Sequence, residues 1–229
     1  MIKNISNLGD AALYCDFGKE VNKEINTNVI KYFKSIKNKK IEGINNLIPS
    51  YNKLIISYDL KKINYQDLKK IIEKIDLDEL NTKLNKRIEI PVCCEDKFAL
   101  DIKRLEEKLL LSKEKIYNNF FNKEYFCYMT GFIAGMPFLG DLDKSMRAKR
   151  LETPRVKVPK GSVGLTEQFA NIYTFESPGG WNIIGNTPIK IFDESKIDNP
   201  NLVNPGDVVT FKEVSLNDYK KLLWVIFLK

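Results

Sequence analysis

The sequence predicts an α+β protein with a small amino-terminal α/β domain, residues 1–85, followed by a β-barrel domain, residues 86–229. Strand and helix patterns alternate through the first third of the chain. From about residue 125, short apolar runs separated by Gly and Pro follow one another, as is typical of compact barrels and sandwiches. A chain of 229 residues is long enough for two such domains.

Hydrophobic periodicity predicts the amino-terminal elements. Residues 11–17 (AALYCDF) and 53–58 (KLIISY) are strand-like, and residues 19–40 carry apolar side chains at steps of three or four, as in an amphipathic helix. Asn64 is a candidate N-cap for a second helix. A strand at 88–92 (IEIPV) follows, so we expect a small open sheet covered by helices.

The carboxy-terminal elements begin with two short helices, residues 101–111 and 112–121, the second with Ser112 as its N-cap. The strand-like runs that follow are YFCYMTGF, VKVPKGSVGL, NIYTFESPGGW, NIIGNTPIKIF and GDVVTFKEV. The last apolar run, residues 222–228 (LLWVIFL), predicts a buried strand and is far shorter than the roughly 20 residues of a membrane-spanning helix.

Composition excludes several kinds of chemistry. The chain has no histidine, which removes Ser-His and Cys-His nucleophile systems and histidine metal sites. Its four cysteines lack CxxC spacing, so we expect free thiols and no metal site. The net charge of +7 rests mostly on dispersed lysines, so we expect neither nucleic acid nor a membrane as partner. Because no signal-peptide pattern is present, we expect a cytoplasmic protein.

A basic segment and several glycine turns could hold an anion. Residues 144–160 contain seven basic residues and one acid, which suits an anion site and a solvated loop equally. The glycines at 161, 164, 179 and 180 suit either a nest, in which successive backbone amides bind an anion, or ordinary barrel turns. Trp181 suits a core anchor or a ligand platform, and Glu176 a base, a metal ligand or a structural acceptor. No phosphate-binding loop is present, so we expect no ATP site in the lone chain.

Three motifs follow one another in the second half: PRxxVPxGSVG from Pro154, ESPGGW from Glu176 and IGxTP from Ile184. Together they resemble the allophanate hydrolase subunit 1 family, which includes the B subunit of bacterial 5-oxoprolinase and the Kip-type inhibitor of a sporulation histidine kinase. Segments 9–13 and 48–51 resemble the opening elements of the same family. The resemblance therefore covers nearly the whole chain.

The resemblance implies a cyclophilin-like β-barrel after the α/β domain. It implies the B subunit of an ATP-dependent 5-oxoprolinase, inactive alone, with ATP and Mg used by the complex. The implied partners are an allophanate hydrolase subunit 2-type protein as the C subunit and a LamB/YcsF-type protein as the A subunit. Two alternatives stay open: a Kip-type module that inhibits a sensor histidine kinase, and a component related to allophanate hydrolase or urea carboxylase.

The family motifs also imply which residues line or shape a substrate or anion site, without assigning catalytic roles. These candidates are Arg155, Lys160, Ser162, Tyr173, Glu176, Ser177, Gly179, Gly180, Trp181 and Thr187. At three positions where the family is usually polar, this chain differs: Phe120 replaces a histidine, Phe169 a glutamine and Asn186 an arginine. The backbone-shaping Gly and Pro residues are kept.

Overall fold

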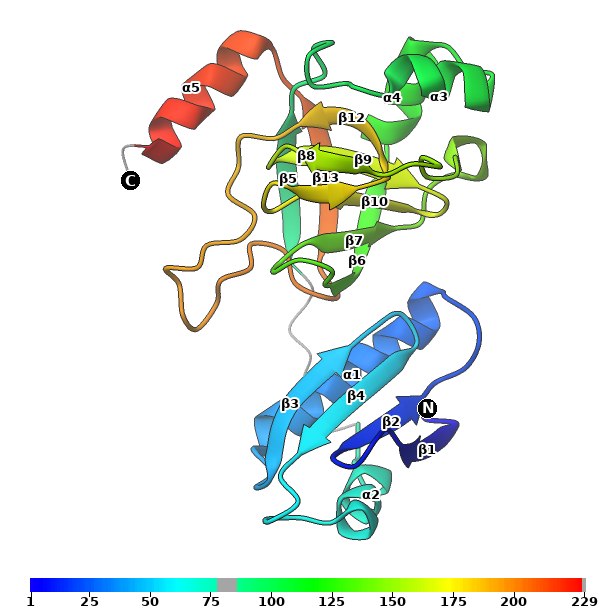
Figure 1. The fold of residues 1–229 in the computed structure, drawn as a ribbon, viewed down its shortest axis with the longest axis vertical. Helices are drawn as coiled ribbons and strands as arrows, with labels where there is room; N and C mark the ends of the chain where they lie inside the picture. The colour runs from blue at the N-terminus through cyan, green and yellow to red at the C-terminus, as the bar shows by residue number, and fades with distance from the viewer. Residues whose placement is uncertain (78–85, 228–229) are drawn as a thin grey trace. The chain divides into compact units, whose positions relative to one another are not determined.

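The protein forms two compact units in the computed structural model, one ending at Leu84 and the other beginning at Asn85 (Figure 1). The structure describes residues 1–77 and 86–227. The predicted domain boundary, between residues 85 and 86, falls at the edge of a stretch outside the described residues, so the boundary stays a prediction. The α+β class is confirmed.

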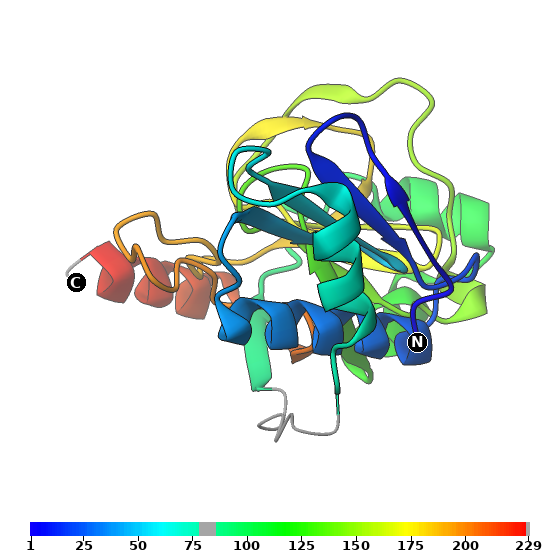
Figure 2. The ribbon, with the colours of Figure 1, turned by 90° about the horizontal axis from the view of Figure 1, so that it is seen from below.

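The amino-terminal unit is an antiparallel sheet of four strands with two helices. Its order is β1-β2-β4-β3, with β1 (Asn4–Asn7), β2 (Ala12–Asp16), β3 (Ile44–Pro49), β4 (Lys53–Tyr58), α1 (Lys23–Lys39) and α2 (Tyr65–Glu73). Figure 2 shows α1 running along the strands of this unit. The side chains of Asn22 and Asn64 cap the two helices. Strands β1 and β3 were not predicted from the sequence.

The second unit is built on a sheet of seven strands that curls into a half-barrel (Figure 1). In spatial order these are β12 (Asn182–Asn186), β9 (Ser162–Thr166), β10 (Phe169–Ile172), β7 (Pro137–Gly140), β6 (Glu124–Thr130), β13 (Val208–Glu213) and β5 (Arg87–Val92). The predicted strand at 88–92 exists and lies in the second unit, among residues 86–229, although the alternation of strands and helices had grouped it with the amino-terminal sheet. As β5 it pairs in parallel with β13, and it buries Ile90 and Val92 in the second core.

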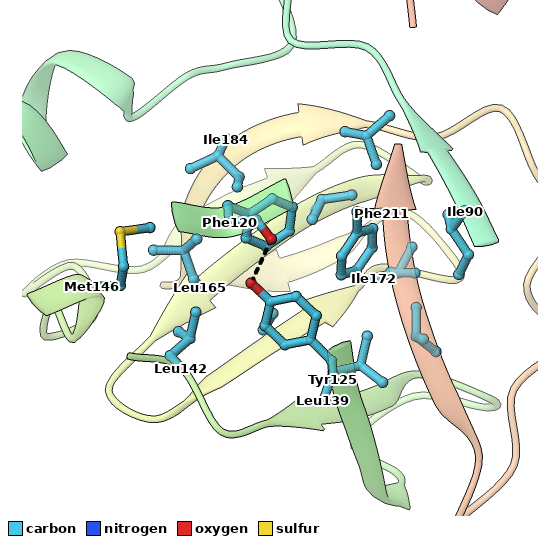
Figure 3. Close-up of a cluster of buried hydrophobic side chains, with 14 of the residues drawn as sticks. Ile90, Phe120, Tyr125, Leu139, Leu142, Met146, Leu165, Ile172, Ile184 and Phe211 are labelled. Carbon is cyan, nitrogen blue, oxygen red and sulfur yellow. Dashed lines mark hydrogen bonds between the residues drawn. The ribbon is translucent and has the colours of Figure 1, made fainter. Parts of the chain in front are cut away.

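Two helices, α3 (Ile102–Leu109) and α4 (Lys113–Phe121), belong to this unit. Ser112 caps α4 as predicted, because its hydroxyl accepts a hydrogen bond from the amide of Lys115. Phe120 of α4 is fully buried and stacks on Phe211 with ring centroids 4.7 Å apart, while Tyr125 donates to its carbonyl (Figure 3). This departure from the family therefore lies in the hydrophobic core.

The two edge strands of the half-barrel meet at one end, where β12 comes beside the end of β5. Cys93 and Asn186 exchange two backbone hydrogen bonds there, of 2.9 and 3.0 Å. A Cβ at Gly185 would lie only 2.6 Å from Val92 Cγ1, so the close approach requires glycine. We call this junction of Cys93, Gly185 and Asn186 the seam. It accounts for the glycine of the IGxTP motif.

Two further strands, β8 (Arg155–Val158) and β11 (Ser177–Gly179), form a separate antiparallel pair that we call the ribbon. Among the described strands, neither pairs with the seven-stranded sheet. A small apolar cluster of Met136, Val158, Tyr173 and Ile183 joins the ribbon to the outer face of the half-barrel. The PRxxV and ESPGG motifs thus belong to one structural element.

The chain continues after β13 into a helix, α5 (Leu216–Phe227). The predicted buried strand at 222–228 is therefore wrong over its described residues. Ser215 accepts a hydrogen bond from the amide of Asp218 and so caps the helix. Trp224 is 71% exposed, and Figure 1 shows α5 projecting from the half-barrel. None of the described helices has the length and apolarity to cross a bilayer.

Candidate functional site

The ten predicted site residues fall into two neighbouring places in the second unit. Lys160, Tyr173 and Thr187 line one cavity, and Ser162 stands directly opposite Asn186 in the β9–β12 pairing at its edge. The other six lie in the ribbon or beside it: Arg155, Glu176, Ser177, Gly179, Gly180 and Trp181. Tyr173 joins the two places, since it lines the cavity and also packs in the cluster under the ribbon.

The cavity has a volume of about 310 Å³ and lies beside the seam. Its walls are Gly161, Tyr173, Thr174, Asn186, Thr187, Pro188, Ile189, Ile191, Tyr219 and Leu223, with Lys160 and Lys190. The Lys190 ammonium pairs with Asp193, whereas that of Lys160 lies over the Phe175 ring. Apolar walls with a few polar groups suit a small ligand that carries a negative charge.

Both polar atoms of the Asn186 side chain, which lines the cavity, have partners within the protein. Its amide nitrogen donates to the Lys160 carbonyl at 2.9 Å, and its amide oxygen accepts from the Tyr219 hydroxyl at 2.7 Å. Gly161, with φ of +80°, brings the backbone close to this side chain. Asn186, at the position where the family usually has arginine, thus links the seam to α5.

Arg155 is held by a buried partner that the sequence did not reveal. Asp101, 4% exposed, accepts two hydrogen bonds from the Arg155 guanidinium, at 2.6 and 3.0 Å. The same carboxylate accepts a third from the Ile183 amide at 2.7 Å. This arrangement fixes the start of the ribbon to β12 and to the beginning of α3. The guanidinium therefore has a buried carboxylate as its partner, and its role in an anion site stays a prediction.

The glycines of ESPGGW bring the backbone against Tyr173. Any side chain at Gly179 would collide with the Tyr173 hydroxyl, whereas a Cβ at Gly180 would make only ordinary contacts. Burial raises the pKa of Tyr173, and hydrogen bonds from Asn171 and the Trp181 amide partly oppose that rise. The phenol is thus neutral, and it packs against the backbone at Gly179. This contact favours the interpretation that glycine is needed here for close backbone approach, and not for an anion-binding nest of amides.

Trp181 and Glu176 differ in their surroundings. The Trp181 ring is half-buried and packs edge-on against Phe138, with ring centroids 5.5 Å apart. Glu176 forms an exposed ion pair with Lys157 at 3.0 Å. Within the described residues no group of three or more Cys, Asp or Glu side chains could hold a metal ion. Trp181 therefore anchors the motif, and Glu176 lies on the surface of the ribbon.

All four cysteines are free thiols, as predicted, and all four are buried. Burial raises the pKa of the Cys94 thiol to about 12, so this group is a neutral thiol at ordinary pH. Cys94 borders a wider groove of about 1080 Å³ between α4 and residues 213–215, whose rim includes Glu95, Asp96 and Glu213. None of the ten predicted site residues lines this groove.

Sequence reasoning missed Asp101, Asn171, Tyr219 and Leu223. Asp101 precedes α3 and lies 54 residues before Arg155, so no local pattern links them. Tyr219 and Leu223 lie on α5, which was predicted as a strand. The Ser-x-x-Asp pattern at Ser215 was the available signal, because it is a helix-start signature.

Comparisons with known proteins agree with the motifs. Residues 3–203 match the family described as "Carboxyltransferase domain, subdomain C and D". The 5-oxoprolinase B subunit of Bacillus subtilis (strain 168) is 34% identical over 228 residues, which cover 94% of each chain. Urea amidolyase of Saccharomyces cerevisiae is 25% identical over 93% of this chain, but this region is 13% of the yeast protein.

A solved structure, that of TTHA0988, has a TM-score of 0.81 and 27% identity. The match covers 89% of this chain and 40% of that longer one. The family match spans most of the sequence, and the Bacillus relative exceeds 30% identity over nearly its full length. The resemblance read from the motifs is therefore confirmed, and the chain, similar over nearly its whole length to a 5-oxoprolinase B subunit, belongs to the carboxyltransferase domain subdomain C and D family.

Proposed function

We propose that this chain is the B subunit of an ATP-dependent 5-oxoprolinase, which converts 5-oxo-L-proline, ATP and water to L-glutamate, ADP and phosphate. The observation that carries the proposal is the 34% identity to the Bacillus 5-oxoprolinase B subunit over 94% of both chains. The name of that relative implies further subunits. In this proposal they are a subunit 2-type protein, the C subunit, and a LamB/YcsF-type protein, the A subunit, and the lone chain is inactive.

The chemistry suits a divided site. The ring amide of 5-oxoproline is unstrained, so its opening is coupled to ATP hydrolysis, and Mg-bound ATP belongs to the assembled complex. This chain contributes a shaped apolar surface: the cavity beside the seam and the ribbon with Trp181. Lys160 at the cavity supplies a positive charge for the substrate carboxylate.

The test is reconstitution. We expect the purified chain alone to release no glutamate from 5-oxoproline and ATP. Co-expression with the C and A subunits of the same source should give a stable complex that forms glutamate and phosphate in equal amounts. Omitting ATP from that complex is the matched control. An intact three-subunit complex that leaves 5-oxoproline unchanged would contradict the proposal.

The alignment with urea amidolyase supports a second substrate class, allophanate or urea, for the same fold. Offering each compound to the complex in place of 5-oxoproline separates the two. The Kip-type alternative is supported by Phe169, an aromatic residue where the family is usually polar. It predicts instead that the lone chain inhibits the autophosphorylation of a histidine kinase.

A further inference from the structure

The groove between α4 and residues 213–215 differs from the chain as a whole in its charge. It is lined by four carboxylates and one ammonium, those of Glu95, Asp96, Glu114, Glu213 and Lys113. Its formal charge is therefore −3, in a chain whose formal charge is +7. We call this cavity the acidic groove. Negative charge gathered in one cleft of a basic protein attracts cationic groups to that place.

Two of these carboxylates lack a counter-charge among the described residues. The ammonium of Lys113 pairs with Asp96 at 3.0 Å. Glu114 lies in the first turn of α4, where the helix dipole favours a negative charge. Glu95 and Glu213 are exposed and form no salt bridge within the part of the chain that the structure describes. The groove thus offers two carboxylates to a cation from outside.

The floor of the acidic groove is partly apolar. Tyr117 and Phe121 of α4 line it, with ring centroids 6.0 Å apart, together with the buried Cys94. Burial is the main cause of the raised pKa of Tyr117, and nearby Cys94, Glu213 and Asp96 add to the rise. Carboxylates from two separate segments therefore act on one ring of the floor. An apolar floor with a charged rim is the usual anatomy of a protein–protein contact.

The carboxylates of the acidic groove are spread along it and do not converge on one point. Within residues 1–77 and 86–227, no group of three or more Cys, Asp or Glu side chains is placed to hold a metal ion. The volume of about 1080 Å³ also exceeds the roughly 300–1,000 Å³ of small-molecule pockets. A chain segment that carries separate lysine or arginine side chains fits this space better than a single ion.

The acidic groove also adjoins the elements that form the candidate site. Cys94 follows the seam residue Cys93. Ser215, at the edge of the groove, caps α5, and Tyr219 of that helix donates a hydrogen bond to Asn186. A segment bound in the groove therefore lies against the start of the helix that borders the cavity. This position favours an occupant that acts at the same site, namely another subunit of the enzyme.

We propose that the acidic groove docks a basic segment of a partner subunit, whose lysine or arginine side chains pair with Glu95 and Glu213. Apolar side chains of the same segment pack on Tyr117 and Phe121. The inference rests on the proposed function, because the name of the Bacillus relative, a B subunit, implies other subunits. Charge complementarity selects the partner and speeds association, and the apolar floor holds it. The groove serves assembly and takes no part in the chemistry.

The test compares two double charge reversals. Glu95→Lys with Glu213→Lys changes the groove, and Glu107→Lys with Glu194→Lys, at exposed carboxylates outside it, is the control with the same change in net charge. Calorimetric titration with each purified partner subunit should show at least tenfold weaker binding for the groove variant and less than twofold for the control. Lys113→Gln, which removes the ammonium of the groove, should strengthen binding several-fold. Equal losses in the two double variants, or no loss in the first, would overturn the proposal.

Two further measurements separate this inference from the proposed function. At saturating concentrations of the partner subunits the groove variant should regain full turnover, and a complex that assembles through the groove but leaves 5-oxoproline intact would contradict the function alone. The lone chain should bind a labelled Lys-Leu-Leu-Lys-Lys peptide more tightly than Lys-Gly-Gly-Lys-Lys, and the groove variant should bind the first at least tenfold more weakly. Equal binding of that peptide by both chains would overturn the inference, whatever the complex does.

Discussion

The seam and the ribbon use the same kinds of residue, glycine beside short strands, but are fastened in different ways. The seam is closed by backbone hydrogen bonds between Cys93 and Asn186, and Gly185 lets the two strands meet. The ribbon is fastened at its start by the buried Asp101–Arg155 pair and supported by Tyr173 beneath Gly179. One junction completes the half-barrel, whereas the other attaches an element to its outer face.

This difference suggests which part of the site can move. Opening the seam would break the sheet itself, and its neighbours are backbone and core atoms. Lifting the ribbon breaks side-chain contacts and leaves the seven-stranded sheet intact. Function is commonly carried by elements of lower local stability on a rigid scaffold, and the ribbon fits that description better than the seam.

The largest expected effect comes from Arg155→Ala, which leaves the Asp101 carboxylate buried without its partner. We expect the free energy of unfolding to fall by about 3–5 kcal/mol, measured by urea denaturation of the whole chain. Lys157→Ala, on the same strand but exposed, is the matched control and should change little. A loss below about 1 kcal/mol would mean that the ribbon is not fastened by this pair.

Gly185→Ala should destabilise the seam by about 3 kcal/mol, because the new Cβ meets Val92 at 2.6 Å and the Cys93 carbonyl at 3.0 Å. Thermal melting measures the effect. Adding Val92→Ala should recover only a small part, since the backbone contact remains. Full recovery in the double variant would show that the backbones are not in close contact at this point.

Gly179→Ala should destabilise the ribbon by about 2 kcal/mol through collision with the Tyr173 hydroxyl. Here Tyr173→Phe should restore part of the loss in a double-mutant cycle, because the obstacle is a side chain. Restoration stays partial, since the nearest ring carbon is 2.8 Å from the new Cβ. Purely additive losses would contradict the assigned contact.

Tyr219→Phe should lower stability by about 1–2 kcal/mol, because the Asn186 amide oxygen loses its buried partner. Hydrogen exchange of α5 should become faster while that of β12 changes little. Exchange that is unchanged in both elements would show that Tyr219 does not fasten the helix.

The smallest effect is expected from Glu176→Gln, which removes the exposed pair with Lys157. We expect a change below about 0.5 kcal/mol that disappears at high salt. A larger loss would mean that Glu176 has a further role in the ribbon. The difference between this exposed ion pair and the buried pair removed by Arg155→Ala would then be smaller than expected.

The sequence was sufficient for elements with strong local signals. Asn64 and Ser112 were identified as helix caps, and the strand at 53–58 was predicted with its observed bounds. The strand prediction for the apolar run from Leu222 was wrong because its residue types occur in strands and helices alike. The Ser215 cap is the signal that indicates a helix. The strand at 88–92 was found, but its partner lies 121 residues later, beyond any local pattern.

For the candidate site, the structure brings the motif residues into two neighbouring places of the second unit, but their spacing did not show which partners their side chains have. Arg155 was predicted to bind an anion, and its guanidinium is engaged by Asp101. Asn186 replaces an arginine and forms a structural link with Tyr219. Both outcomes depend on partners brought together by the fold, so they could not be read from spacing. The roles of the remaining candidates stay predictions.

The parallel pairing of β5 with β13 also determines the order in which the chain can fold. As the protein is synthesised, the four strands of the amino-terminal sheet are all available by Tyr58. Strand β5, made soon afterwards, has no described strand neighbour other than β13 and must wait until Val208–Glu213 has emerged. Contacts of such long range form slowly and leave a strand edge exposed meanwhile. The second unit is therefore the part of the nascent chain that depends most on protection against aggregation.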